Sequence, residues 1–249
     1  MKRFEINPHT LSNVILLTSR AYADYLTPFL LTENPAINVL QLVHPNQIND
    51  LPDEFLMSSR LISFGTRFYI APKILERIGY GSYNFHPGST AYPGWAPFLY
   101  AIYENTKKYG VTVHEMSPKI DAGKIVSLLE FDIPPHTTPQ QLVDLTTAHM
   151  VSLFQQLANQ FAKQTSYLLP IGAQWQKSPN RKRDFAALCH IPQGIDAAEL
   201  KRRIFAFGDS DGEVFPYLFI EGKKYRLAFE NDHPDRYSHW LHSFRFVID

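Results

Sequence analysis

The sequence has little of what membrane proteins, disulfide-stabilised secreted proteins and nucleic-acid binders usually contain. Its single cysteine, Cys189, cannot form an internal disulfide, which fits a reducing cytosol. No apolar run is long enough to span a bilayer, and residues 1–13 have no apolar stretch typical of a signal peptide. Lys and Arg together number 24, as do Asp and Glu, so the basic excess that favours phosphate binding is absent. We therefore expect a cytoplasmic protein with no membrane partner, and the charge balance counts against a nucleic-acid partner without excluding a local basic patch.

Short β-rich runs alternate with segments of helical periodicity in the first two thirds of the chain. Runs at 13–18 and 37–43 predict buried strands, and the apolar residues between them recur at helical spacing. A β-α-β unit of this kind favours parallel strands with a right-handed crossover. The predicted fold class is therefore α/β, with a Rossmann-like, mostly parallel sheet flanked by helices. Further strands are expected at 61–65, 83–87, 111–116 and 125–133, and helices at 71–79, at 97–109 and from 139 onward.

The composition changes after the last of these helices. Residues 1–173 are expected to form the catalytic domain, and the polar, basic stretch within 174–195 is expected to be a linker. Residues 196–249 then predict a small α+β unit with a β-hairpin turning at Glu221-Gly222. Because this unit is rich in β-strands and aromatic residues, it is also where a homodimer could pair.

Polar residues interrupt two of the predicted strands in a way that suggests a pocket. Asn84 and His86 are two apart and so share one face of a strand, as do Thr112 and His114. Ligands bind open parallel sheets at the carboxyl ends of strands, and Asn84 and His86 lie at such an end. Asp121 follows shortly after, beside a glycine turn. Taken singly, each has an ordinary explanation as a turn or a solvated strand face.

The order and spacing of these residues resemble those of a known family. Residues 84–87 read Asn-x-His-Pro and are followed by a loop rich in Pro and Gly. Residues 110–114 then read Gly-Val-Thr-x-His, and residues 121–123 read Asp-x-Gly. The whole stretch 83–126 resembles the 10-formyltetrahydrofolate-dependent formyltransferases, and especially the compact members that act on small amines or sugars. The resemblance implies formyl transfer from this folate to a primary amine, with no metal.

The resemblance also implies roles for individual residues. Asn84, His86 and Asp121 correspond to the catalytic set, in which an amide donor stabilises an oxyanion, an imidazole accepts a proton and a carboxylate orients the imidazole. Thr112 and His114 are expected to support this set from behind.

Binding residues are inferred from their position. Gly65, Phe68 and Ile70, together with Asp121, are candidates for holding the folate, although core packing explains Phe68 and Ile70 nearly as well.

Aromatic and basic residues are the candidates for binding the acceptor. Tyr92 and Trp95 could stack against a sugar or base, or could simply pack within their loop. The basic run within 177–183 could bind a diphosphate, although such runs are more often only solvated.

Motifs that are absent from the sequence narrow the choice of acceptor amine. The segment after the first strand lacks the Gly/Ser-rich phosphate loop of glycinamide ribonucleotide formyltransferases. The loop after Asn-x-His lacks the Arg-Gly pair of methionyl-tRNA formyltransferases. We also expect no further domain before the first strand, whereas formyltetrahydrofolate hydrolases have one. The favoured acceptor is therefore a nucleotide-linked amino sugar. Hydrolysis of the folate, transfer to methionyl-tRNA and non-catalytic binding of folate or a nucleotide sugar stay as alternatives.

Overall fold

The computed structural model describes residues 10–208, 215–229 and 244–248. Residues 1–9, most of the stretch predicted to lack a signal peptide, lie outside these ranges, as do parts of the predicted 196–249 unit. The chain forms two compact units. The first comprises Met1–Pro93, Gly110–Phe131 and Thr146–Pro179, and the second comprises Gly94–Tyr109, Asp132–Leu145 and Asn180–Asp249.

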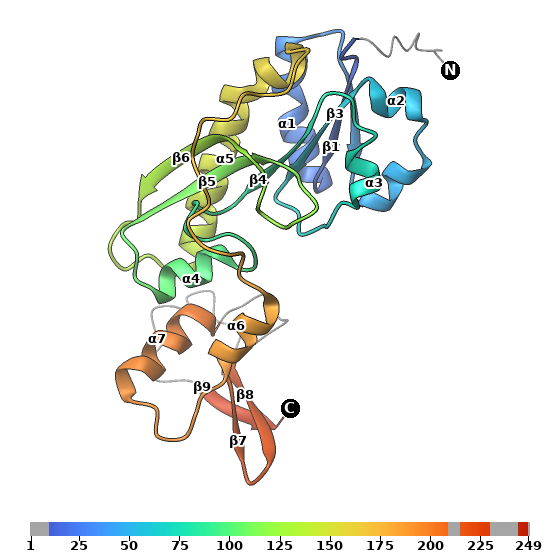
Figure 1. The fold of residues 1–249 in the computed structure, drawn as a ribbon. Helices are drawn as coiled ribbons and strands as arrows, with labels where there is room; N and C mark the ends of the chain where they lie inside the picture. The colour runs from blue at the N-terminus through green and yellow to red at the C-terminus, as the bar shows by residue number, and fades with distance from the viewer. Residues whose placement is uncertain (1–9, 209–214, 230–243, 249) are drawn as a thin grey trace. The chain divides into compact units, whose positions relative to one another are not determined.

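The first unit is built on a six-stranded sheet with the strand order β2-β1-β3-β4-β5-β6 (Figure 1). The strands are β1 (Asn13–Leu17), β2 (Asn38–Leu42), β3 (Ser59–Phe64), β4 (Ser82–His86), β5 (Lys108–Glu115) and β6 (Ile125–Asp132). β1 is parallel to β2 and β3, and β3 is parallel to β4, whereas β5 runs antiparallel to β4. The predicted Rossmann-like α/β fold with a mostly parallel sheet is confirmed.

Both faces of the sheet are covered, because successive side chains of its central strands enter two different cores. Val14 and Leu16 of β1 pack with residues of α1 (Arg20–Glu33) and α5 (Pro139–Lys163). Ile15 and Leu17 pack on the opposite face. That face is covered by the 3₁₀ helix η1 (Pro45–Asp50), α2 (Asp53–Met57) and α3 (Pro72–Leu75). A strand buried on both faces needs a continuous apolar run, which is what residues 14–17 supply.

Two predicted helices are wrong in extent. The helix expected at 97–109 is α4 (Pro97–Tyr103), and β5 begins at Lys108. Asn105 adopts a left-handed φ of 50°, which ends the helix before the alternating β5 sequence begins. The helix expected at 71–79 is the single turn α3, after which the chain packs closely on α2. A Cβ at Gly79 would lie 1.8 Å from the carbonyl oxygen of Met57.

The start of α5 follows the predicted capping pattern. The Thr138 hydroxyl accepts a hydrogen bond from the Gln141 N–H at 3.2 Å, and the Gln141 side chain accepts one from the Thr138 N–H at 2.9 Å. Both partners satisfy backbone N–H groups that would otherwise have no intrahelical acceptor, and Pro139 occupies the first helical position.

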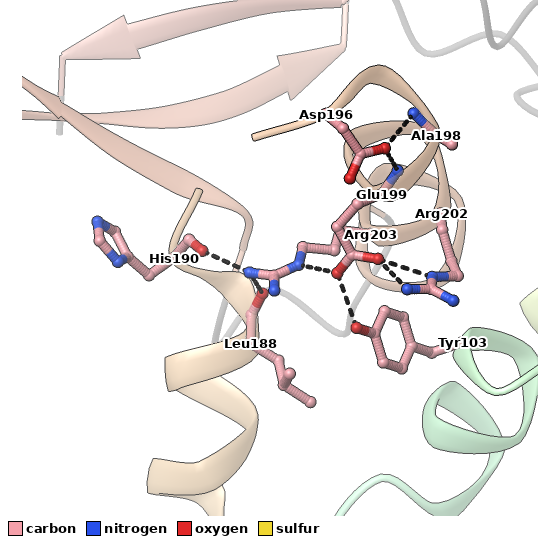
Figure 2. Close-up of polar contacts among 8 residues, drawn as sticks. All are labelled: Tyr103, Leu188, His190, Asp196, Ala198, Glu199, Arg202 and Arg203. Carbon is pink, nitrogen blue, oxygen red and sulfur yellow. Dashed lines mark hydrogen bonds and ion pairs between the residues drawn. The ribbon is translucent and has the colours of Figure 1, made fainter. Parts of the chain in front are cut away.

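The second unit contains α4, α6 (Lys182–Cys189), α7 (Ala197–Phe207) and an antiparallel sheet of β7 (Tyr217–Ile220), β8 (Lys223–Phe229) and β9 (Phe244–Ile248). The predicted hairpin at Glu221-Gly222 is confirmed, and positive φ values of 48° and 75° at these residues match the tight turn. The whole of α6 falls within the stretch 174–195 that was predicted to be a linker. Figure 2 shows how Arg203 of α7 connects Glu199 to the end of α6. Within the described ranges, no helix has the length and apolar character to span a membrane.

Candidate active site

The candidate site is formed where β4 and β5 present polar side chains on the same face of the sheet. Tyr83 and Phe85 of β4 point into the core that contains α5, so Asn84 and His86 point to the opposite face. The antiparallel register places Asn84 opposite His114, and His86 opposite Thr112. The sequence places each pair two residues apart, and the pairing of the two strands brings all four together.

Asp121 joins the two histidines. One carboxylate oxygen lies 3.2 Å from Nδ1 of His86, and the other lies 3.2 Å from Nε2 of His114. The side chains of the three residues are at most 8% exposed. The Asn84 amide nitrogen lies 3.2 Å from His114 Nε2, so the amide is held against the same cluster. The structure therefore brings together Asn84, His86, His114 and Asp121, four of the residues predicted for the site.

Each histidine has one ring nitrogen that does not face Asp121, and the hydrogen-bond partner of that nitrogen determines whether it carries hydrogen. His86 Nε2 lies 2.8 Å from the Tyr92 carbonyl, and His114 Nδ1 lies 2.8 Å from the Glu115 carbonyl. Since a carbonyl oxygen only accepts, both of these nitrogens carry hydrogen. A proton is then needed between His86 Nδ1 and Asp121, and this pair is electrically neutral with one shared proton. The contact between His114 Nε2 and Asp121 has room for a second proton.

Burial sets the charge preference of His86. Loss of solvation lowers the pKa of His86 below its ordinary value, and the neighbouring His114 lowers it further. Asp121 and the hydrogen bond to Tyr92 act in the opposite direction but do not outweigh burial. His86 therefore favours its neutral form near neutral pH, which is the form that can accept a proton.

The loops around the cluster are tightly fixed. Asp121 adopts a left-handed φ of 40°, which Asp tolerates better than most residues. Gly123 packs on the backbone of β5, since a Cβ there would lie 1.7 Å from the Glu115 carbonyl oxygen. Thr112 is buried and donates its hydroxyl hydrogen to the Gly88 carbonyl at 2.8 Å, which fixes the loop after β4. The Asp-x-Gly spacing thus has a steric basis.

One residue of the site was missed by the sequence analysis. Trp175, in the stretch predicted to be a linker, packs edge-on against both His86 and His114, with ring centroids 5.6 Å and 5.2 Å away. Its indole N–H donates to the Gly123 carbonyl at 3.0 Å. A tryptophan within a polar, basic stretch was the available signal, because such a ring has no apolar periodicity to explain it.

The residues predicted to bind the folate lie in different environments. Gly65 has a positive φ of 60° at the carboxyl end of β3 and an open space where a Cβ would lie. Phe68 is 42% exposed and packs edge-on against His44. Ile70 is buried in the core with α2 and α3, so its side chain packs there. Of the three, Gly65 and Phe68 remain accessible.

The two aromatic residues predicted to bind the acceptor are in different units. The ring of Tyr92 is buried under the ammonium group of Lys177, and its carbonyl serves as the acceptor for His86. Trp95 belongs to the second unit, where the ammonium group of Lys182 lies 5.5 Å from its ring centroid. No group of three or more His, Cys, Asp or Glu side chains is arranged to hold a metal ion in the part of the chain that the structure describes.

Fold and site together define a Rossmann-like α/β protein with an amide, two imidazoles and a carboxylate at the carboxyl end of β4. Residues 65–156 match the family model described as formyl transferase. This stretch is therefore similar to the formyl transferase family, in the region that holds the motifs at 84–87, 110–114 and 121–123.

The proteins that this chain resembles include methionyl-tRNA formyltransferases by sequence and sugar N-formyltransferases by fold. The chain is 32% identical over 95 residues to a methionyl-tRNA formyltransferase of Thermotoga neapolitana, which covers 36% of this chain and 30% of that protein. Matches to the first curated relatives span only 30–40% of their lengths. A sugar N-formyltransferase structure from a Shewanella species has a TM-score of 0.71 at 14% identity, covering 90% of this chain and 99% of that one.

A Helicobacter canadensis N-formyltransferase was solved with folinic acid and dTDP-3-aminofucose. It has a TM-score of 0.58 at 15% identity and covers 90% of each chain. Identities this low establish a shared fold.

Proposed function

We propose that this protein transfers a formyl group from 10-formyltetrahydrofolate to the primary amine of a small molecule. The convergence of Asn84, His86 and Asp121 at the carboxyl end of β4 carries this proposal. An acyl transfer of this type needs a donor for the developing oxyanion and a group that accepts a proton from the amine. Both are provided here within one buried cluster.

Asn84 is the proposed oxyanion donor. Its amide nitrogen has two hydrogens, of which one can be directed to His114 Nε2 while that nitrogen carries no proton. The other is then available for the oxygen of the formyl group as the amine adds to its carbon. Loss of a single oxyanion donor typically reduces the rate about 10²–10³-fold.

The proton acceptor is the His86–Asp121–His114 cluster acting together. His86 Nε2 already donates to the Tyr92 carbonyl and Nδ1 already shares a proton with Asp121, whereas the gap between His114 Nε2 and Asp121 has room for a further proton. The new bond joins the amine nitrogen to the formyl carbon, and the amine proton enters the cluster. The cluster then returns a proton to the folate nitrogen as its bond to the formyl carbon breaks. Neutral His86, favoured by burial, is the starting state this requires.

A nucleotide-linked amino sugar is the acceptor class we propose. The similarity to sugar N-formyltransferases extends over 90% of the chain, and the loop after β4 has no basic residue between Gly88 and Pro97. The sequence similarity to methionyl-tRNA formyltransferases covers a smaller part of the chain and keeps tRNA as the second candidate.

The test is to supply the full-length protein with 10-formyltetrahydrofolate and a panel of nucleotide-linked amino sugars, and to follow both folate release and formylated product. We expect turnover that requires an amine, and its near-complete loss in Asn84→Ala and His86→Ala. Asn159→Ala is the matched control, because that side chain is exposed and donates to Glu33, away from the cluster. Folate turnover without amine would instead indicate a hydrolase, and turnover only with methionyl-tRNA would indicate the second candidate. Folate binding without any turnover would contradict an enzymatic role.

A further inference from the structure

Residues 168–177 run along the site as an extended segment, here called the strap. Its backbone N–H groups at Leu168 and Ile171 donate to the Tyr83 hydroxyl at 2.8 Å and to the Ile125 carbonyl at 2.9 Å. It therefore passes from the Tyr83 side chain of β4 to the backbone of β6 before it reaches the histidines. The segment has no periodic secondary structure, and these bonds fix its course.

Two neighbouring strap residues fasten the loops that hold the catalytic cluster. Trp175 donates to the Gly123 carbonyl at 3.0 Å and so ties down the loop that carries Asp121. Gln176 bonds to Thr90 twice, from its backbone N–H to the carbonyl at 2.9 Å and from its side-chain amide to the hydroxyl at 3.0 Å. Each loop supplies one of the two groups that flank His86.

The Thr90 contact matters because of the residue two positions later. Tyr92 provides the carbonyl that accepts the His86 Nε2 hydrogen, and the Lys177 ammonium group lies 5.1 Å from the centroid of the Tyr92 ring. The strap thus holds the acceptor on one side of His86, and through the Trp175 contact it holds Asp121 on the other.

We propose that the strap residues Trp175 and Gln176 are positioning residues for catalysis, which set the orientation of His86 and exclude water from its pairing with Asp121. This inference rests on the proposed function. The indole packs edge-on against both imidazoles, and neither strap residue bonds to Asn84, the proposed oxyanion donor. Their role is therefore to act through His86 and Asp121.

The charged and titratable groups that face His86 are Asp121 and His114, with Lys177 reaching the Tyr92 ring. Replacing Trp175 adds or removes none of these charged groups. Removal of the indole lets water approach the imidazole, which weakens the burial that lowers the pKa of His86. The pKa of His86 is therefore expected to rise toward its ordinary value in Trp175→Ala.

The experiment compares Trp175→Ala, Trp175→Phe and Gln176→Ala with the control Gln174→Ala, whose exposed side chain makes a 3.5 Å contact to Gly172 within the strap. The titration of His86 is followed by NMR of the imidazole nitrogens, which needs no substrate. Trp175→Ala should raise the pKa of His86 by about half a unit or more and lower kcat about 10–100-fold, with KM nearly unchanged. Trp175→Phe retains the aromatic contact and should recover most of kcat, while Gln174→Ala should match the wild type.

An unchanged or lowered pKa of His86 in Trp175→Ala, with kcat also unchanged, would overturn the proposal even if the melting temperature falls. A rise in KM with kcat unchanged would do the same, since it would assign Trp175 to substrate binding. If the wild type transfers no formyl group but the pKa of His86 still rises in Trp175→Ala, the proposed function fails and the positioning role stands.

Discussion

At the residue scale, Gly123 has a steric role that can be tested separately from the chemistry. Its backbone packs on β5 so closely that a Cβ would lie 1.7 Å from the Glu115 carbonyl oxygen, and its own carbonyl accepts from Trp175. Because the obstructing atom belongs to the backbone, Gly123→Ala must shift the loop that carries Asp121. We expect kcat to fall at least about tenfold and the free energy of unfolding to fall by about 1–3 kcal/mol, measured by steady-state kinetics and urea denaturation.

Gly194→Ala is the control for this substitution. Gly194 has a positive φ of 79° with open space around a Cβ, so alanine there introduces backbone strain without a clash. It should cost about 1 kcal/mol and leave kcat unchanged. Equal kcat in Gly123→Ala and in the wild type would show that the Asp121 loop tolerates displacement.

The clustering of Asn84, His86 and Asp121 could be predicted from the sequence, whereas the residues that support the cluster could not. Asn84, His86 and Asp121 lie in short motifs whose spacing can be read directly from the sequence. Trp175 reaches the same cluster from a stretch without periodicity, about fifty residues further along the chain, and only tertiary structure brings it there. Tyr92 contributes a backbone carbonyl, and any residue type carries that group.

At the element scale, Arg60 connects β3 to the end of α5. It is fully buried, and all five of its N–H groups donate to main-chain carbonyls, at distances of 2.7–2.9 Å. Two of these acceptors, at Gln160 and Phe161, lie in the last turn of α5, where the negative end of the helix dipole favours a cation. Burial lowers the pKa of Arg60 to about 10, which still leaves it charged at neutral pH.

Arg60→Met should therefore destabilise the protein by about 3–5 kcal/mol, because it removes the guanidinium donors of the buried Tyr80 and Phe161 carbonyls. Arg60→Lys retains the charge but supplies three donors in place of five, so an intermediate loss is expected. Urea denaturation measures both. Arg77→Met is the control, because that side chain is partly exposed and pairs with the exposed Asp53. Losses of similar size at Arg60 and Arg77 would contradict the role assigned to the buried guanidinium.

Element boundaries also show where sequence patterns stop being informative. The predicted strand at 61–65 begins two residues late, because Ser59 and Arg60 look polar although both are buried. The predicted helix at 97–109 runs into β5, because Lys107 and Lys108 fit either structure. The apolar runs predicted that the strands exist. They did not predict the strand boundaries, which fall at polar residues.

In the second unit, Glu199 holds α7 in a network of charged and aromatic groups (Figure 2). It accepts from Arg202, Arg203 and the Tyr103 hydroxyl. Although burial raises its pKa, the hydrogen bonds from Arg203, Tyr103 and Arg202 lower it to about 2. Since the folded-state pKa lies below the ordinary value of 4.5, the resulting stabilisation is present above pH 4.5 and is lost as the pH falls toward 2.

Glu199→Gln removes this stabilisation, so its effect should depend on pH. The melting temperature of the full-length variant should lie below that of the wild type at pH about 5, and the difference should shrink toward pH about 3. Thermal denaturation monitored by circular dichroism gives both values. Glu130→Gln, at an exposed position of β6, is the matched control. A difference that stays constant over this range would mean that the carboxylate charge of Glu199 contributes no stability.

At the scale of the whole molecule, the salt dependence of turnover should distinguish a tRNA acceptor from a nucleotide-linked amino sugar. The chain carries 24 basic and 24 acidic residues, so it has no net field that would attract a polyanion. A tRNA acceptor that contacts 6–10 phosphates would lose about 10³–10⁵ in affinity between about 50 mM and about 200 mM salt. An amino sugar linked to a nucleotide has few charges, so kcat/KM should fall less than about tenfold over the same range. Steady-state kinetics with the best acceptor of the panel, repeated with the donor folate saturating, measures this dependence. A steep fall in kcat/KM would mean that the acceptor site is lined with cations, and would favour a nucleic-acid acceptor for this chain.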